Sequence, residues 1–270
     1  MRKIINRVIS CRQAGIPITL FQMTNLKNKV AVITGGAGGI GSAISKRLAS
    51  AGVTVIVTYN NNADKAFELV RALDGNNHAA VHAPVDKGPE LKKLTDFVAG
   101  KYGKLDILVN NAGITTHVPH EDLDGLTDDW IDKIFSTNFR GSFGMIRACK
   151  NLLLQSDDAL IVNISSVAAI SGIGSNVAYC ASKAAIDSMT RSLARALAPM
   201  IRVVSVSPGW VMGDYAKNVN AEFLQKQLDA TPLNRFAVPE DVADAVFALA
   251  TTLKFTTGSV IPVDGGRLLN

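Results

Sequence analysis

Tyr179 and Lys183 stand four residues apart in the segment Asn-Val-Ala-Tyr-Cys-Ala-Ser-Lys, which ends at Lys183. On an α-helix this spacing places the phenol and the ammonium on one face, where they can interact. A neighbouring positive charge stabilises phenolate over phenol and should lower the tyrosine pKa from its usual ~10. A tyrosine that exchanges protons near neutral pH can act as an acid/base catalyst. The alternative is an ordinary pair on a helix surface, so the rest of the chain has to decide.

A second candidate is the glycine-rich segment 34–41, which reads Thr-Gly-Gly-Ala-Gly-Gly-Ile-Gly. Glycine lets the backbone turn tightly and approach a pyrophosphate closely, and a helix N-terminus offers unpaired N–H groups and the positive end of a dipole. Because the segment lies between an apolar run and a helical pattern, it predicts a dinucleotide site.

The elements that must position these residues alternate along the chain. From residue 28 onward, short β-branched runs alternate with longer helical stretches, which is typical of a parallel sheet. The near-continuous apolar character of the runs indicates that both sheet faces are covered. We predict strands at 30–34, 53–58, 79–83, 105–110, 160–164, 201–206 and 259–263, and helices at 39–51, 62–73, 88–102, 126–154, 177–199 and 238–252.

This pattern predicts an α/β protein: a Rossmann-type, doubly wound, seven-stranded parallel sheet with helices on both faces. No repeat or linker divides residues 26–270, so we expect a single domain there. Residues 210–237 lack a strong pattern and are expected to form a substrate-binding loop or lid, with a decorative insertion as the alternative. Residues 1–25 form a basic extension without an acidic side chain, for which we weigh a disordered tail against an organelle-import leader.

Composition excludes several other classes. The chain has 270 residues, a formal net charge of +5 and no dense basic run with interleaved aromatics, so we expect no nucleic-acid partner. Three cysteines without a Cys-x-x-Cys pair predict neither a disulfide framework nor a metal site. No apolar stretch approaches the ~20 residues that span a bilayer. We expect a cytoplasmic protein with no membrane partner.

The glycine spacing of residues 34–41, together with Asn110-Asn-Ala-Gly113, resembles the short-chain dehydrogenase/reductase family. The resemblance covers residues 28–266, because further motifs follow in the family's order. They are Asp86, Asn138, the pair Ser165 and Ser166, Tyr179 with Lys183, Pro208 with Gly209, and Val263-Asp-Gly-Gly266.

The resemblance implies four catalytic residues. The family's serine lies thirteen residues before its tyrosine, which selects Ser166 over Ser165. Ser166 would hydrogen-bond the substrate carbonyl oxygen and Tyr179 would protonate it, while a nicotinamide supplies hydride. Lys183 would also hold the nicotinamide ribose, and Asn138 would fix a water that links Lys183 to solvent. The alternatives are a turn hydroxyl for Ser166 and a backbone-bonding helix side chain for Asn138.

The resemblance also implies a set of cofactor-binding residues. Asp86 would hydrogen-bond near the adenine, although it could instead cap the following helix. The expected set is Gly35, Gly39, Ile40, Gly41, Tyr59, Asn60, Asp86, Asn111, Ala112, Gly113, Tyr179, Lys183, Pro208, Gly209 and Val211. The chain departs from the family after Gly209, where Gly213 lies near a position that is commonly a hydroxyl residue.

The identity of the dinucleotide depends on the end of the second strand. An acidic side chain there would bond the adenosine ribose of NAD and repel a 2′-phosphate. This chain has Tyr59 at that position, followed by three asparagines, so we predict NADP. NAD is the alternative, because no arginine is present to clamp the phosphate and Gly38 occupies a loop position that is often basic in NADP-using relatives.

We therefore predict an NADP-dependent oxidoreductase that interconverts a ketone or 3-oxoacyl group with a secondary alcohol. The resemblance is greatest to 3-oxoacyl carrier-protein reductases, through residues 231–241. The alternatives are an NAD-dependent alcohol dehydrogenase of the same family and a non-catalytic dinucleotide-binding sensor or scaffold. The family resemblance further implies a homotetramer or dimer, assembled through helices 126–154 and 177–199 and the last strand.

Overall fold

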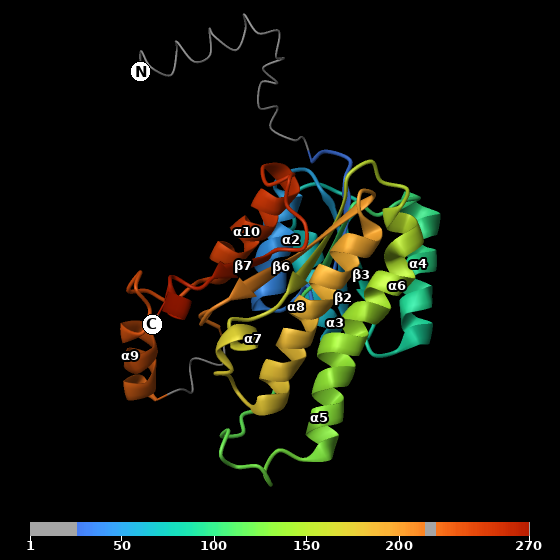
Figure 1. Ribbon diagram of the computed structural model, residues 1–270. Helices are drawn as coiled ribbons and strands as arrows, with labels where there is room; N and C mark the ends of the chain where they lie inside the picture. The colour runs from blue at the N-terminus through green and yellow to red at the C-terminus, as the bar shows by residue number, and fades with distance from the viewer. Residues whose placement is uncertain (1–25, 214–219, 270) are drawn as a thin grey trace, which may run out of the picture.

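The structure, a computed structural model, describes residues 26–213 and 220–269 (Figure 1). The predicted basic extension, residues 1–25, lies outside these residues. Seven parallel strands form one sheet in the order β3-β2-β1-β4-β5-β6-β7. Their bounds are β1 Val30–Ile33, β2 Thr54–Tyr59, β3 Ala79–His82, β4 Ile107–Asn110, β5 Ala159–Ile164, β6 Ile201–Pro208 and β7 Val260–Val263. The predicted seven-stranded, doubly wound α/β fold is confirmed.

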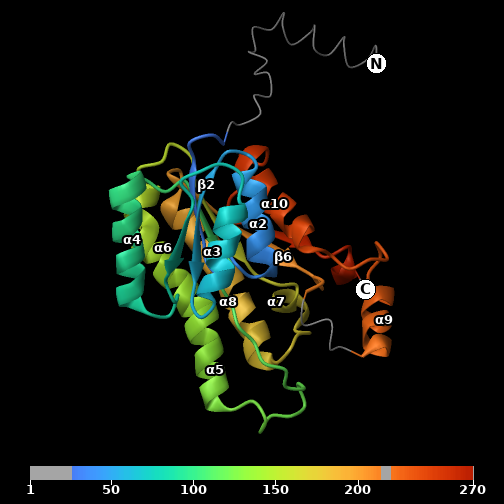
Figure 2. The same ribbon diagram turned by 180° about the vertical axis from the view of Figure 1, so that it is seen from behind.

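Helices cover both faces of the sheet (Figures 1 and 2). One face packs against α2 (Gly39–Ala49), α3 (Ala63–Ala72) and α10 (Pro239–Thr251). The other packs against α4 (Gly88–Tyr102), α6 (Ser142–Leu153) and α8 (Val177–Leu197). Successive side chains of β1 alternate between the two cores: Ala31 and Ile33 join the first, Val30 and Val32 the second. Every position of β1 is therefore apolar, which explains the unbroken apolar run there.

Two predicted elements were wrong in detail. The helix predicted at 126–154 is instead α5 (Asp128–Phe135), a π-helical segment η1 (Ser136–Gly141) and then α6. The segment 210–237 contains a helix, α9 (Ala221–Asp229), and two further short helices were not predicted: α7 (Ala168–Ser171) and η3 (Arg267–Leu269). A three- or four-residue helix carries too little periodicity to be recognised. A π-helical segment of about one turn is likewise too short for sequence periodicity to separate it from the helices that flank it.

None of the helices among the described residues is long and apolar enough to cross a membrane.

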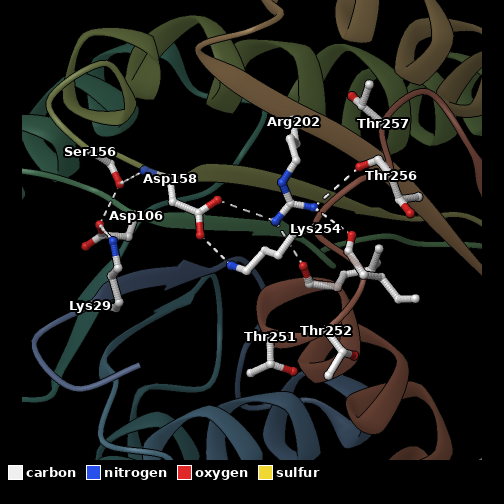
Figure 3. A network of polar contacts seen from close by, with 12 residues as sticks. Lys29, Asp106, Ser156, Asp158, Arg202, Thr251, Thr252, Lys254, Thr256 and Thr257 are labelled. Carbon is white, nitrogen blue, oxygen red and sulfur yellow. Dashed lines mark hydrogen bonds and ion pairs between the residues drawn. The ribbon is translucent and has the colours of Figure 1, made fainter. Parts of the chain in front are cut away.

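The buried carboxylate of Asp106 connects groups at the amino-terminal ends of the central strands (Figure 3). Asp106 lies just before β4, has 0% exposure and accepts hydrogen bonds from the Val30 backbone N–H at 2.9 Å and from Ser156 Oγ at 2.6 Å. Lys29 Nζ lies 2.8 Å from its carboxylate and Lys104 Nζ 3.1 Å. Burial opposes ionisation of Asp106, but these hydrogen bonds outweigh it and hold its pKa below the usual value.

Beside Asp106, Arg202 extends the network toward β6 and α10 (Figure 3). Its guanidinium donates to the backbone carbonyls of Leu249 at 2.9 Å and Leu253 at 3.3 Å, and lies 3.7 Å from Asp158. Lys254 also pairs with Asp158. The network therefore connects the amino-terminal ends of β1, β4, β5 and β6. This is the end of the sheet opposite the glycine-rich turn.

We expect Asp106→Asn to lower the free energy of unfolding at pH 7 by about 2–4 kcal/mol, because two lysines lose a buried partner. The folded-state pKa is lowered, so the stabilisation is present above the ordinary carboxyl value of ~4 and is lost as pH falls through the lower folded value. Urea unfolding at pH 7 and near pH 3 should show the difference from wild type narrowing in acid. Asp96→Asn, which breaks an exposed ion pair with Lys92, is the control and should have little effect. An equal loss in both variants would contradict this account.

Candidate active site

The turn after β1 and the turn after β4 are hydrogen-bonded to each other. Thr34 Oγ1 accepts from the backbone N–H groups of Asn111 and Ala112, both at 2.9 Å. The Asn111 side-chain amide returns two bonds, to Thr34 O at 2.9 Å and Gly35 O at 3.1 Å. The predicted residues Gly35, Asn111 and Ala112 therefore meet at the carboxyl edge of the sheet, where ligands bind in doubly wound folds.

Close backbone packing explains the glycines of this turn. Gly35 has φ of +59°, a conformation that favours glycine. A Cβ on Gly41 would lie 2.5 Å from Gly35 O and 2.8 Å from Asn111 Nδ2, so no side chain fits there. Helix α2 begins at Gly39 with no side-chain cap and no acidic residue in its first turn. A pyrophosphate fits this helix start, because its amides and dipole are free of a competing carboxylate.

The other predicted adenosine-side residues lie at the ends of neighbouring strands. Tyr59 ends β2, and its ring packs 6.0 Å from the Phe67 ring and 5.6 Å from the His82 ring, while Asn60 beside it is exposed. Asp86 follows β3 and lies 3.3 Å from Lys87 Nζ. The alternative role for Asp86, capping α4, is not seen, because the N-cap residue is Lys87 and no side chain caps that helix.

Helix α8 carries Tyr179 and Lys183, as the spacing predicted. Lys183 is buried, and its Nζ donates to the Ile164 carbonyl at 2.8 Å and lies 5.7 Å from the centre of the Tyr179 ring. Burial lowers the pKa of Lys183 to about 8, while the charge of Asp187 acts in the opposite direction.

The expected lowering of the Tyr179 pKa was wrong for the protein by itself. Burial raises the pKa of the phenol above its usual value, and Cys180 acts in the same direction. A hydrogen bond with Ser166 lowers the pKa but does not outweigh burial. Lys183 has little effect because its ammonium lies under the ring and bonds a carbonyl instead of the hydroxyl. The protonated phenol is therefore the form present near neutral pH.

Ser166 and its neighbour Ser165 have different surroundings. Ser166 Oγ accepts from the Ala168 backbone N–H at 3.2 Å and interacts with Tyr179, so it lies beside the phenol. Ser165 is buried and donates to the Lys183 carbonyl at 3.2 Å, behind α8. Of the two hydroxyls, only that of Ser166 is placed near the candidate proton donor.

Asn138 lies in the π-helical segment η1 and is fully buried. Its Oδ1 accepts from the Ile114 N–H at 2.8 Å, and its Nδ2 donates to Ile114 O at 3.1 Å and to Ser182 Oγ at 3.0 Å. A Cβ on Gly113 would lie 3.3 Å from Asn138 Oδ1 and 3.6 Å from Lys183 Nζ. The side-chain ends of Asn138 and Lys183 therefore both lie close to the backbone of Gly113.

The remaining predicted contacts lie after β6. The Pro208 carbonyl accepts from the Val167 N–H at 3.0 Å, and a Cβ on Gly209 would lie 2.9 Å from Asp264 Cα. Val211 forms a parallel bridge with Ala237. This bridge closes the base of the 210–237 segment, so that segment leaves and re-enters the fold beside the candidate site.

Sequence reasoning missed Asn176 as a positioning residue. It is fully buried, and its Oδ1 accepts from the Tyr179 N–H at 2.7 Å, which caps the start of α8. Its Nδ2 donates to the Thr116 carbonyl at 2.7 Å and to Thr115 Oγ1 at 3.3 Å. An asparagine three residues before a helical tyrosine is itself an N-cap signal, so this residue could have been found.

In the described part of the chain, no three His, Cys, Asp or Glu side chains are grouped as metal ligands would be. A cavity of about 540 Å³ lies between α2, the end of α3 and α10. Its lining carries side chains of both charges, including Arg47 and Asp244, and none of the predicted catalytic residues. It is therefore separate from the candidate active site.

The structure has the features of a nucleotide-dependent oxidoreductase. They are a parallel doubly wound sheet, a glycine-lined helix start and a Ser-Tyr-Lys cluster at the same edge of the sheet. A family model described as Enoyl-(Acyl carrier protein) reductase matches residues 35–267. The chain belongs to the short-chain dehydrogenase/reductase family, whose members interconvert carbonyl and hydroxyl groups with a nicotinamide cofactor.

Several relatives match nearly the whole chain. A 3-oxoacyl-(acyl-carrier-protein) reductase of Staphylococcus epidermidis is 34% identical over 90% of this chain and 100% of its own length. One of Synechocystis is 34% identical over 92% and 100%. The crystal structure of a Brucella melitensis short-chain dehydrogenase/reductase, named for glucose/ribitol dehydrogenase, has a TM-score of 0.85 and 28% identity, and covers 91% of this chain and 99% of that one.

We expect Gly41→Ala to abolish dinucleotide binding, because the new methyl group would overlap Gly35 O and Asn111 Nδ2 and force the two turns apart. Fluorescence titration with NADPH and NADH measures this directly. Gly100→Ala within α4 is the matched control, since a Cβ there meets no atom within 4 Å. Wild-type affinity in Gly41→Ala would contradict the proposed role of this turn.

Proposed function

We propose that this protein is an NADP-dependent carbonyl reductase in which Tyr179 donates the proton. The observation that carries the proposal is the convergence of Ser166, Tyr179 and Lys183, with Gly113 and Asn138 beside the lysine. The substrate class is a small ketone or a 3-oxoacyl compound, as the names of the relatives suggest. The product would be the corresponding secondary alcohol.

A nicotinamide cofactor, when bound, supplies the hydride for such a reduction. Ser166 would hold the carbonyl oxygen of the substrate through its hydroxyl. Tyr179 would then give its proton to that oxygen as negative charge develops there. The raised pKa of the phenol supports this direction, because the proton to be donated is present at neutral pH.

Lys183 has two roles in this proposal. In the protein by itself its ammonium bonds the Ile164 carbonyl, and with a cofactor bound it would reach the nicotinamide ribose hydroxyls. In that position, away from the Ile164 carbonyl, a charged Lys183 would also stabilise the phenolate left after proton transfer. Asn138 would support both roles by holding residues 113 and 114 against η1, with its predicted water link to solvent as part of the proposal.

The preference for NADP rests on the lack of an acidic side chain at the end of β2. Tyr59 and the exposed Asn60 present no carboxylate to a 2′-phosphate. We further propose a small-molecule substrate and a homotetramer or dimer in the cytoplasm, as the sequence predicted.

Two other functions would use parts of the same site. An NAD-dependent alcohol dehydrogenase would use the same residues with Tyr179 as the base. A non-catalytic dinucleotide sensor would need the glycine-rich turn alone, so the cluster of Ser166, Tyr179 and Lys183 argues against it.

We expect Tyr179→Phe to lower turnover by about 10²–10⁴-fold while NADPH affinity is largely retained, because only the proton donor is lost. The assay follows loss of NADPH absorbance with a panel of ketones and short 3-oxoacyl thioesters. Tyr102→Phe is the matched control, since its hydroxyl donates to Asn77 O far from the site. Unchanged turnover in Tyr179→Phe, with an active wild type, would exclude the proposed mechanism.

Wild-type protein should show a lower Michaelis constant for NADPH than for NADH. Tyr59→Asp should reverse this order, because a carboxylate at the end of β2 bonds the adenosine ribose of NAD and repels a 2′-phosphate. Steady-state kinetics with NADPH and NADH, for wild type and for Tyr59→Asp, measures both Michaelis constants. A wild-type preference for NADH would favour the NAD-dependent alternative.

A further inference from the structure

Asp187 is a buried carboxylate with no role in the mechanism described so far. It lies on α8, one turn beyond Lys183 and therefore on the same face of the helix. Only 3% of its surface is exposed, and Lys183 has 5%. Its Oδ1 accepts no hydrogen bond from the residues that the structure describes. A buried, incompletely bonded carboxylate is costly, so a charge at this position calls for an explanation.

The groups that face Asp187 come from three elements. The charges that act on it are those of Arg191 and Lys183, both on α8. From the end of β5 and from β6 the facing groups are the hydroxyls of Ser165 and Ser205. Burial raises the pKa of Asp187 above its usual value, and these hydroxyls and the two positive charges offset that rise in part. Among the described residues, Lys183 is the catalytic candidate that this negative charge affects.

Lys183 is in an environment that opposes its charge. Burial lowers its pKa to about 8, and among the residues with described positions Asp187 is the group that raises it again. The only hydrogen bond from its ammonium within the described residues goes to the neutral Ile164 carbonyl. Without Asp187, the described part of the chain would leave the buried lysine without the negative charge that raises its pKa.

We propose that Asp187 is a positioning residue whose buried negative charge keeps the ammonium of Lys183 charged beneath Tyr179 at neutral and mildly alkaline pH. This inference rests on the proposed function. It places Asp187 behind Lys183, out of contact with substrate and cofactor and outside the catalytic set.

The pH dependence of kcat/KM for carbonyl reduction provides the readout, because this quantity reports ionisations of the free enzyme. Activity that requires charged Lys183 is present below the pKa of the lysine and is lost as pH rises through it. Removing the charge of Asp187 therefore moves the alkaline limb of the pH profile, the pH range over which kcat/KM falls as pH rises, to lower pH. Tyr179 is two turns from Asp187, about twice as far along the helix as Lys183, so its ionisation responds less.

We expect Asp187→Asn to move the alkaline limb down by about one pH unit, while activity at pH 6.5 stays close to that of wild type. Asp187→Glu keeps the charge, so its alkaline limb should lie close to the pH at which wild type has it. If Asp187→Asn does not fold, Asp187→Ser removes the same charge with a smaller side chain and makes the same prediction.

Thr190→Val is the matched control for a purely structural role. Thr190 is fully buried on the same helix and bonds Asn163 Nδ2 at 2.8 Å and Ser205 Oγ at 2.9 Å, so its loss disturbs the same packing without changing a charge. An unmoved alkaline limb in Asp187→Asn, or an equal movement in Thr190→Val, would overturn the inference. Activity in Tyr179→Phe would instead overturn the proposed function, so the two failures are distinguishable.

Discussion

The side-chain amide of Asn138 forms hydrogen bonds with both the N–H and the carbonyl of Ile114, and the candidate site depends on these two bonds. It fixes the loop after β4 between two other elements. On one side the same loop is bonded to the glycine-rich turn through Thr34 and Asn111. On the other side Ser182 connects Asn138 to α8, which carries Tyr179 and Lys183. The turns after β1 and β4, η1 and α8 are therefore held together by hydrogen bonds that meet on the loop 111–114.

Burial sets the charge states of the central pair. The same desolvation raises the pKa of Tyr179 and lowers that of Lys183, since each group loses water that would stabilise its charged form. Both shifts favour neutral side chains in the protein by itself. A reductase needs the phenol protonated before the reaction and a positive charge nearby as the proton leaves. The first requirement is met by burial, and the second requires a counter-charge such as Asp187.

Much of this arrangement could be predicted from the sequence. Apolar runs located the seven strands, and the glycine spacing and the four-residue step from Tyr179 to Lys183 indicated the nucleotide turn and the helix face. Local patterns do not record how a long helix is interrupted, so the π-helical segment around Asn138 was missed. They also do not record burial. The pKa of Tyr179 was therefore predicted in the wrong direction, and the role of Asn176 as a cap was overlooked.

We propose that the glycine-rich turn and α8 hold one cofactor molecule, with its nicotinamide ribose at Lys183. The most direct measurement is a crystal structure of the protein with NADPH. We predict that the pyrophosphate lies at the start of α2 and that Lys183 Nζ leaves the Ile164 carbonyl to bond the nicotinamide ribose hydroxyls, beside Tyr179. A nicotinamide ribose beyond hydrogen-bonding distance of Lys183 would contradict the account.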